Sequence, residues 1–198
     1  MVAAGAEAHS PRAACGELMH NVEIKLELCD LPLARTLAVA LGATPIIKLQ
    51  QTDTYFRVHN GRLKRRESPG EPIEYVFYDR PDRADAKVSH FQIYSEPEYH
   101  AKFGLTPLPI WVVVRKCREV LLLGNVRIHL DRVAHLGDFL EFEAMVTPSC
   151  NIARCHETVA DLRRALAPAC GGLIAVSYAD LIASDLEHDA EQWDREAR

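Results

Sequence analysis

The sequence predicts an α+β protein dominated by β-strands, and two observations support this fold class. First, apolar and polar residues alternate with a period of two through most of the central region, which is typical of strands with one buried face. Second, the polar faces of these strands carry biased charge, basic on several strands and acidic on one hairpin. A sheet that closed into a barrel would hold these charged faces inside and leave its apolar faces to be covered by helices.

The length of 198 residues suits one domain, which we expect over residues 19–184. Residues 1–18 lack a continuous apolar stretch and are expected to form a disordered lead, and the acidic residues 185–198 are expected to form a frayed helix or a tail. No segment approaches the roughly 20 apolar residues needed to cross a bilayer. Six scattered cysteines favour a reduced, cytoplasmic protein, and the net charge of −5 argues against nucleic-acid binding. We therefore expect neither nucleic acid nor a membrane as partner, and a monomer or a homodimer.

The elements follow in order along the chain. The first strand, residues 21–28, reads NVEIKLEL and alternates strictly. Asp30 and Pro32 are typical of a helix start, and Gly42 of its end. Turns rich in Gly, Pro or Asn then separate five further predicted strands: residues 51–58, 62–67, 73–80, 88–95 and 111–120. The last predicted elements are a hairpin over residues 125–146, a helix over 156–166, and an apolar segment over 173–186 that fits either a strand or a helix.

The hairpin over residues 125–146 carries the most chemical information. Its arms are joined at 134–137, and Gly137 can adopt the positive φ that a tight turn requires. Antiparallel pairing would bring Asp131, Glu141 and Glu143 towards one surface. Carboxylates crowded in this way repel one another unless they share cations, and their oxygens suit Mg²⁺ or Mn²⁺. The alternative is an ordinary hairpin with a solvated outer face.

Basic residues recur at alternate positions of the neighbouring strands, namely Arg62, Lys64 and Arg66, then Arg80, then Lys116 and Arg118, then Arg127. Each side chain alone could extend to solvent from an open sheet. Together with the carboxylates they describe a site for a polyanion bridged by metal, because basic groups neutralise phosphate oxygens while carboxylates hold divalent ions.

Several short motifs, met in this order, resemble the CYTH family, also called triphosphate tunnel metalloenzymes. They are NVEIK, QTDTYF, GRLKRRE, YDRPD, the KxR of Lys116 and Arg118, RIHLD, LGDFLEFE and SYADL. The family includes class IV adenylyl cyclases, thiamine triphosphatases and inorganic triphosphatases. The resemblance implies a closed eight-stranded antiparallel β-barrel, or tunnel, with a few helices packed outside and a triphosphate bound inside.

Position by position, the resemblance implies two sets of site residues. The phosphate-binding set is Lys25, Arg62, Lys64, Arg66, Arg80, Lys116, Arg118 and Arg127. The set that holds divalent metal is Glu23, Asp131, Glu141 and Glu143, and these four with Lys25 form the expected catalytic group. The family's opening signature is ExExK, whereas this chain has Asn21 at the first position, which removes one negative charge from the expected metal site.

Three functions agree with these residues. The first is a metal-dependent phosphohydrolase that cleaves inorganic tripolyphosphate, a nucleoside triphosphate or thiamine triphosphate, with Mg²⁺ or Mn²⁺ as cofactor. The second is a cyclase that converts ATP to cyclic AMP with the same phosphate and metal apparatus. The third is a non-catalytic sensor of polyphosphate or nucleotide. Hydrolysis is favoured because water is the default nucleophile in a wet tunnel.

Two further residues have alternative roles. His129 lies between Arg127 and Asp131 on the charged face, where it could act as a base or could orient Asp131 through a hydrogen bond. Tyr178 could reach the tunnel mouth or could pack the last element against the barrel.

Overall fold

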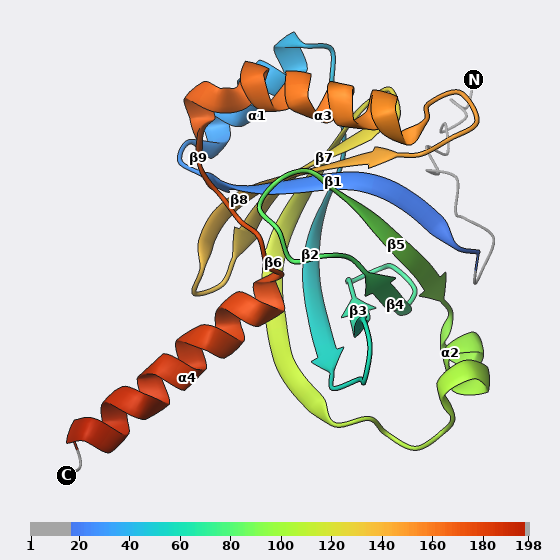
Figure 1. Cartoon of the computed structure of the whole chain (residues 1–198), viewed down its shortest axis with the longest axis vertical. Coiled ribbons are helices and arrows are strands. Elements are labelled where there is room, and N and C mark those ends of the chain that lie inside the picture. The colour runs from blue at the N-terminus through green and yellow to red at the C-terminus, as the bar shows by residue number, and fades with distance from the viewer. Residues whose placement is uncertain (1–16, 197–198) are drawn as a thin grey trace, which may run out of the picture.

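The computed structural model describes residues 17–196, with side chains described as far as residue 188 (Figure 1). The predicted lead, residues 1–18, lies almost wholly outside the described residues. The strands are β1 (Met19–Leu28), β2 (Thr44–Phe56), β3 (Arg62–Glu67), β4 (Glu74–Asp79), β5 (Lys87–Tyr94), β6 (Ile110–Leu123), β7 (Val126–Val133), β8 (Gly137–Met145) and β9 (Cys170–Leu173). The helices are α1 (Leu31–Ala40), α2 (Glu96–Phe103), α3 (Ile152–Leu166), the short 3₁₀ helix η1 (Ala167–Ala169) and α4 (Tyr178–Glu196).

Eight of these strands close into a barrel. The hydrogen-bonded order is β5-β4-β3-β2-β6-β7-β8-β1-β9, and an additional pairing of β1 with β5 joins the two sides. All pairings are antiparallel, and β9 adds to the edge of β1 beyond the closed ring. The predicted eight-stranded antiparallel barrel is therefore confirmed, with one extra strand.

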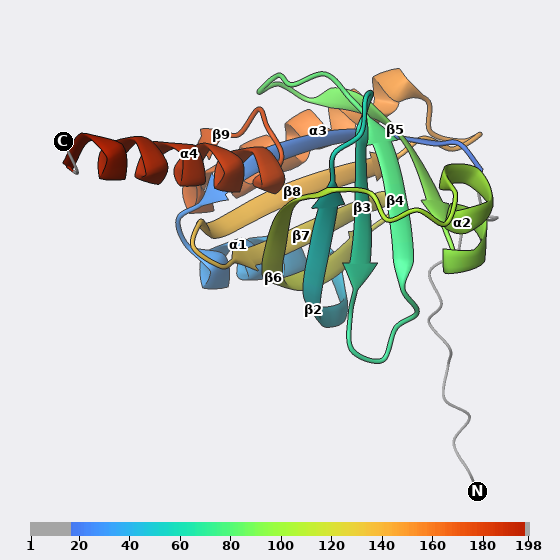
Figure 2. The ribbon, with the colours of Figure 1, turned by 90° about the horizontal axis from the view of Figure 1, so that it is seen from below.

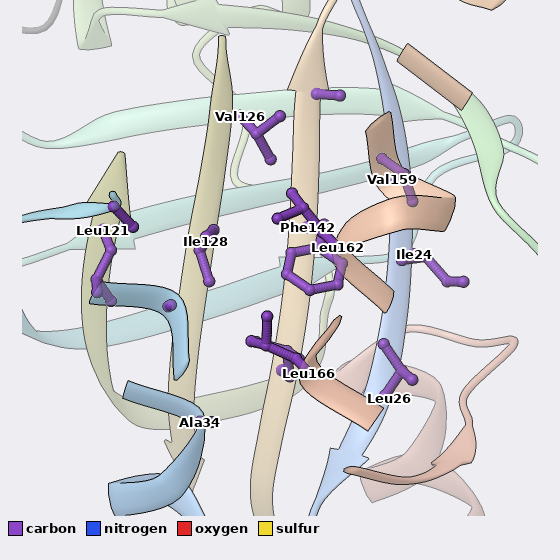
Figure 3. Packing of buried hydrophobic residues seen from close by; sticks show 14 of the residues in the cluster. Ile24, Leu26, Ala34, Leu121, Val126, Ile128, Phe142, Val159, Leu162 and Leu166 are labelled. Atoms are coloured by element: carbon purple, nitrogen blue, oxygen red, sulfur yellow. The ribbon is translucent and has the colours of Figure 1, made fainter. Parts of the chain in front are cut away.

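In the strands that lie beneath the helices, β1, β7 and β8, alternation separates an apolar outer face from a largely charged inner face. Val22, Ile24 and Leu26 of β1 are buried in one apolar cluster with residues of α1 and α3, whereas Glu23 and Lys25 point the other way. Figure 1 shows α1 and α3 lying together over β1, β7 and β8, and Figure 3 shows the side chains between these layers. The main hydrophobic core thus lies outside the barrel, between its wall and the helices.

The hairpin of β7 and β8 forms as predicted. Gly137 adopts φ +105°, and Ile128 faces Phe142 across the two strands. Ile128, Leu130 and Phe142 are all buried in the core beneath the helices. The charged residues between them consequently face the barrel interior.

The apolar segment over residues 173–186, which fitted either a strand or a helix, forms a helix from Tyr178 onward, and only Leu173 belongs to β9. At the start of α4 the Ser177 amide and hydroxyl both donate to the Asp180 carboxylate, at 2.8 and 2.7 Å. This capping interaction satisfies free backbone N–H groups and fixes the helix start. Figures 1 and 2 show α4 leaving the barrel wall and projecting away from it.

Two differences from the sequence prediction have local causes. The α2 helix was not predicted, although Ser95 and Glu98 form a capping box at its start and Tyr99 stacks on Tyr75 of β4. The β2 strand begins at Thr44 rather than near residue 51, because its first half pairs with β6 alone, before β3 joins its other edge. Among the described residues, no helix combines the length and apolarity required to span a bilayer.

Candidate active site

The barrel interior gathers charged side chains from nearly every strand. Within the described part of the chain, the interior set comprises seven cations, Lys25, Lys64, Arg66, Arg80, Lys87, Lys116 and Arg118, and five carboxylates, Glu23, Asp53, Asp131, Glu141 and Glu143. In β1, β7 and β8 they alternate with apolar residues on the outer face, so the period-two pattern of the sequence positions them. Buried charges at this density require partners, and here they pair mainly with one another.

Asp53 of β2 holds the largest group of cations. Its carboxylate is fully buried, accepts two bonds from Arg66 at 2.8 and 2.9 Å, and contacts Nζ of Lys116 at 2.7 Å and of Lys64 at 3.2 Å. Burial alone would raise the pKa of Asp53, but Arg66 and the two lysines hold it well below its usual range. The sequence reading did not select Asp53, although it lies within QTDTYF and shares the inner face with Gln51 and Tyr55.

A second group centres on Arg118 of β6. Its guanidinium donates to both oxygens of Asp131, at 2.7 and 2.6 Å, and to Glu141 Oε2 at 2.9 Å. The Tyr178 hydroxyl, from the start of α4, donates to Asp131 Oδ2 at 2.9 Å. Lys25 Nζ lies 4.2 Å from the centre of the Tyr178 ring. Tyr178 therefore reaches the charged interior, and its ring also packs the start of α4 against Phe139 of the barrel, so the two predicted roles coexist.

A third group lies where β1 meets β5. Arg80 Nη1 lies 2.7 Å from Glu23 Oε1, and Lys87 Nζ donates to the backbone oxygens of Arg83 and Ala175, at 2.7 and 2.9 Å. Burial raises the pKa of Glu23 even though Arg80 opposes this shift. Lys87 is fully buried and stands opposite Glu23 in the β1–β5 ladder, yet the sequence reading did not select it, because no charged neighbour at i±2 on β5 marked its face.

His129, Glu141 and Glu143 form a fourth group. The His129 Nδ1 atom lies 3.8 Å from Glu141 Oε2 and 3.8 Å from Glu143 Oε1, and one donor atom from each residue lies within 4.8 Å of the others. The ring does not hydrogen-bond to Asp131, whose oxygens are bound by Arg118 and Tyr178 instead. Among the described residues, the contacts of Asp131 thus give no support to the alternative in which His129 orients it. The donor set of one imidazole and two carboxylates fits a divalent metal ion.

The two remaining predicted cations lie towards the ends of the charged strand faces. Arg62 donates to Asp82 at 2.7 Å and to Asp180 of α4 at 2.9 Å. Arg127 Nη1 lies 4.0 Å from Glu143 Oε2, and about a third of its side chain is exposed. These two arginines are less enclosed than the central set, and Arg62 also links α4 to the barrel.

Three interior lysines are held partly away from their charged form. Burial, together with neighbouring arginines, lowers the pKa of Lys64 to about 7 and the pKa of Lys116 and Lys87 to about 8 each. Asp53 opposes the shift at Lys64 and Lys116 without cancelling it. The interior thus holds more cationic groups than its own carboxylates can neutralise, which favours the entry of an anion.

Asn21 occupies the first position of the signature and faces the interior beside Glu23. It is buried, and its Oδ1 atom has no hydrogen-bond partner among the described residues. A buried oxygen without a hydrogen bond costs free energy. A bound ion, or a hydrogen-bond donor of a bound ligand, would remove that cost.

A cavity of about 500 Å³ lies beside the barrel wall rather than within this set. Its lining combines the 67–73 segment with outer-face residues of β2 and β6, such as Thr52 and Arg115. It meets the charged interior only at Gln51 and Lys116. Chemistry therefore places the candidate site in the interior, and the outer cavity is a neighbouring feature.

The comparisons with known proteins agree with this geometry. A family model described as the CYTH domain matches residues 19–175. No curated protein matches the chain. The PH1012 protein from Pyrococcus horikoshii is 22% identical, with a TM-score of 0.64 over 81% of this chain and 98% of that one.

Two other similar structures carry names that refer to nucleotide chemistry. A candidate adenylate cyclase from Vibrio parahaemolyticus is 15% identical, with a TM-score of 0.63 over 82% of this chain and 97% of that one. HpAC1 from Hippeastrum, a candidate adenylyl cyclase described as having a dominant triphosphatase activity, is 15% identical, with a TM-score of 0.58 over 83% of this chain and 96% of that one. At these identities the likeness establishes the shared fold.

Proposed function

The chain belongs to the CYTH family, and from that premise we propose that it is a metal-dependent phosphohydrolase that cleaves a triphosphate bound inside its barrel. The candidate substrates are inorganic tripolyphosphate, a nucleoside triphosphate and thiamine triphosphate. The observation that carries the proposal is the excess of interior cations over interior carboxylates, seven against five among the described residues. A closed, charged interior of this kind is stable only if water, ions or a charged ligand complete it.

The interior cations would bind and orient the triphosphate. Arg66 and Arg118 present planar guanidinium groups that suit two phosphate oxygens at once, whereas Lys64 and Lys116 supply point charges from β3 and β6, the two strands that flank β2. Both lysines contact Asp53, so the carboxylate holds them in place before substrate arrives. This preorganisation lowers the cost of neutralising the charge that develops on phosphate oxygens during transfer.

The carboxylates would hold the metal. Glu141 and Glu143 lie with His129 in one group, and Glu23 lies across from Glu143 in the β1–β8 ladder. Although burial alone would raise the pKa of Glu141, Lys25 and Arg118 hold it well below its usual range, so the group is ionised and able to bind a cation. A divalent ion held there would polarise the phosphoryl group and assist the ionisation of a water molecule.

A product assay tests the proposal. Purified protein is incubated with tripolyphosphate, ATP or thiamine triphosphate and Mg²⁺ or Mn²⁺, and the products are identified by ³¹P NMR and chromatography. Release of orthophosphate or pyrophosphate, without cyclic AMP, is expected. A matched pair of variants serves as control, since Arg118→Met should abolish turnover whereas Arg132→Met, at an exposed surface pair with Asp138, should not. Formation of cyclic AMP from ATP would assign the cyclase reaction instead, and intact substrate in every reaction would leave a binding protein.

A further inference from the structure

The His129 imidazole lies in the charged interior, but binding of phosphate by the cations does not explain why it is there. It lies on β7, faces Glu141 across the β7–β8 ladder, and is 4% exposed. Its Nδ1 atom is buried and has no hydrogen-bond partner within the described part of the chain. A buried ring nitrogen without a hydrogen bond is costly, and the nearest acceptors, oxygens of Glu141 and Glu143, lie at 3.8 Å, so an ion between the three groups would satisfy the nitrogen and both carboxylates.

We propose that His129 is a direct ligand, through Nδ1, of the metal that Glu141 and Glu143 hold, and that the site therefore prefers Mn²⁺ or another first-row transition ion to Mg²⁺. The inference rests on the proposed function only in that both concern the same interior site. It goes further by naming the class of ion. Imidazole nitrogen suits transition metals, whereas Mg²⁺ favours a shell made almost entirely of oxygen.

The distances fit this assignment. With metal–ligand bonds of about 2.1 Å, adjacent ligands of an octahedral ion lie about 3.0 Å apart and opposite ligands about 4.2 Å apart. Nδ1 of His129 lies 3.8 Å from an oxygen of each glutamate, and the three donor atoms fall within 4.8 Å of one another. Small side-chain rotations would bring all three onto one ion.

The partners of the other carboxylates support the same choice. Asp131 is fully buried with both oxygens bound by Arg118, one of them also by Tyr178, so it is already neutralised. Glu23 is paired with Arg80 at 2.7 Å. Glu143 has weaker contacts, 4.0 Å to Arg127 and 3.8 Å to His129.

Glu141 is shared between two cations, since its Oε2 atom accepts from Arg118 at 2.9 Å while its Oε1 atom lies 3.7 Å from Lys25. Two carboxylates and one imidazole supply three ligands for a divalent ion, so ligation does not require an acid at position 21. The Asn in place of the first acid of the signature is consistent with a site that has exchanged charge for a nitrogen ligand.

Spectroscopy and titration without substrate test the inference. Mn²⁺ is added to the full chain, and electron spin-echo modulation from a ¹⁴N nucleus reports whether an imidazole is bound to the ion. Affinities for Mn²⁺ and Mg²⁺ are measured by calorimetry and by competition. We expect ¹⁴N modulation in the wild-type protein and its loss in His129→Gln, with the ratio of Mn²⁺ to Mg²⁺ affinity falling about tenfold or more.

His20→Gln is the matched control, because His20 pairs with His90 on the outer face of the β1–β5 seam and should leave both readouts unchanged. Absence of ¹⁴N modulation in the wild-type protein would overturn the inference even if His129→Gln failed to fold, and so would an unchanged affinity ratio. Because no triphosphate is present, the result is independent of the hydrolysis assay. A protein that hydrolyses tripolyphosphate without nitrogen ligation refutes this inference alone, and one that binds Mn²⁺ through nitrogen without hydrolysis refutes the proposed function alone.

Discussion

Asp53 is expected to be the most important single side chain for the stability of the free barrel. It is fully buried and is the shared partner of Arg66, Lys64 and Lys116. The substitution Asp53→Asn keeps the size of the side chain but leaves three cations around a neutral amide. Removing one partner from a buried ion pair costs about 3–5 kcal/mol, because the remaining charge stays buried without compensation. Loss of protons from the two lysines, whose pKa values are already lowered, limits the cost to that range.

Urea denaturation of the two proteins at pH 7 measures this difference in the free energy of unfolding. Asp138→Asn provides the control, because Asp138 pairs with the exposed Arg132 on the outer surface, where a salt bridge contributes less than about 1 kcal/mol. Tripolyphosphate should stabilise Asp53→Asn more than wild type, since the polyanion can take the place of the missing carboxylate. If Asp53→Asn costs no more than Asp138→Asn, the reasoning that Asp53 neutralises the interior cations is wrong.

Three further predictions concern ligands. Glu143→Gln should weaken Mn²⁺ binding by about tenfold or more. The activity of this variant should recover partly at raised Mn²⁺, because mass action opposes the weaker affinity. An unchanged Mn²⁺ titration would exclude Glu143 from the metal site. Tripolyphosphate binding should weaken as pH rises from 7 to 9, and binding in this range should be accompanied by proton uptake. The reason is that Lys64, Lys116 and Lys87 lose their protons there in the free protein but are held charged by bound phosphate. Calorimetry in buffers of different ionisation enthalpy measures the proton uptake, and a pH-independent affinity would contradict the prediction. Asn21→Glu should tighten Mn²⁺ binding by about tenfold or more, as expected for one regained charge-assisted contact of roughly 1.5–3 kcal/mol. Weaker Mn²⁺ binding in this variant would mean that the site is fitted to Asn.

The barrel could be predicted from the sequence because its strands obey one simple rule. In β1 the residues after Asn21 alternate between apolar and charged, and the structure places the two sets on opposite faces. The closure of β1 onto β5 could not be predicted from this pattern alone, because alternation specifies faces and not partners. The family resemblance supplied the closed ring. The start of α4 was ambiguous because its apolar residues fit both periods, and the Ser177–Asp180 cap decided it.

The interior residues that were not predicted from the sequence have no charged neighbour on the same face of a predicted strand. Arg66 was found because Lys64 stands two residues before it, whereas Asp53 lies between Gln51 and Tyr55 on its face and Lys87 lies one residue before the predicted strand 88–95. Their importance comes from other strands, since Arg66 faces Asp53 across the β2–β3 ladder and Glu23 faces Lys87 across the β1–β5 ladder. Such contacts depend on register, which a single sequence does not give.

The pairing inside the free barrel implies that triphosphate and metal bind cooperatively. Arg118 bonds to both Asp131 and Glu141, so a phosphate group that drew Arg118 towards itself would leave two buried carboxylates short of positive charge. A divalent ion beside Glu141 and Glu143 would restore that charge, and the same ion would leave Arg118 free to contact phosphate.

Linkage is reciprocal, so Mn²⁺ should tighten tripolyphosphate binding by the same factor by which tripolyphosphate tightens Mn²⁺ binding, about 5- to 150-fold for typical couplings. The coupling between the two ligands should shrink markedly in Arg118→Met, because this variant has no guanidinium for phosphate to draw away from the carboxylates. Calorimetry at saturating and zero levels of the second ligand measures both factors, and two affinities that do not depend on each other would mean that the interior cations and carboxylates act as separate sites.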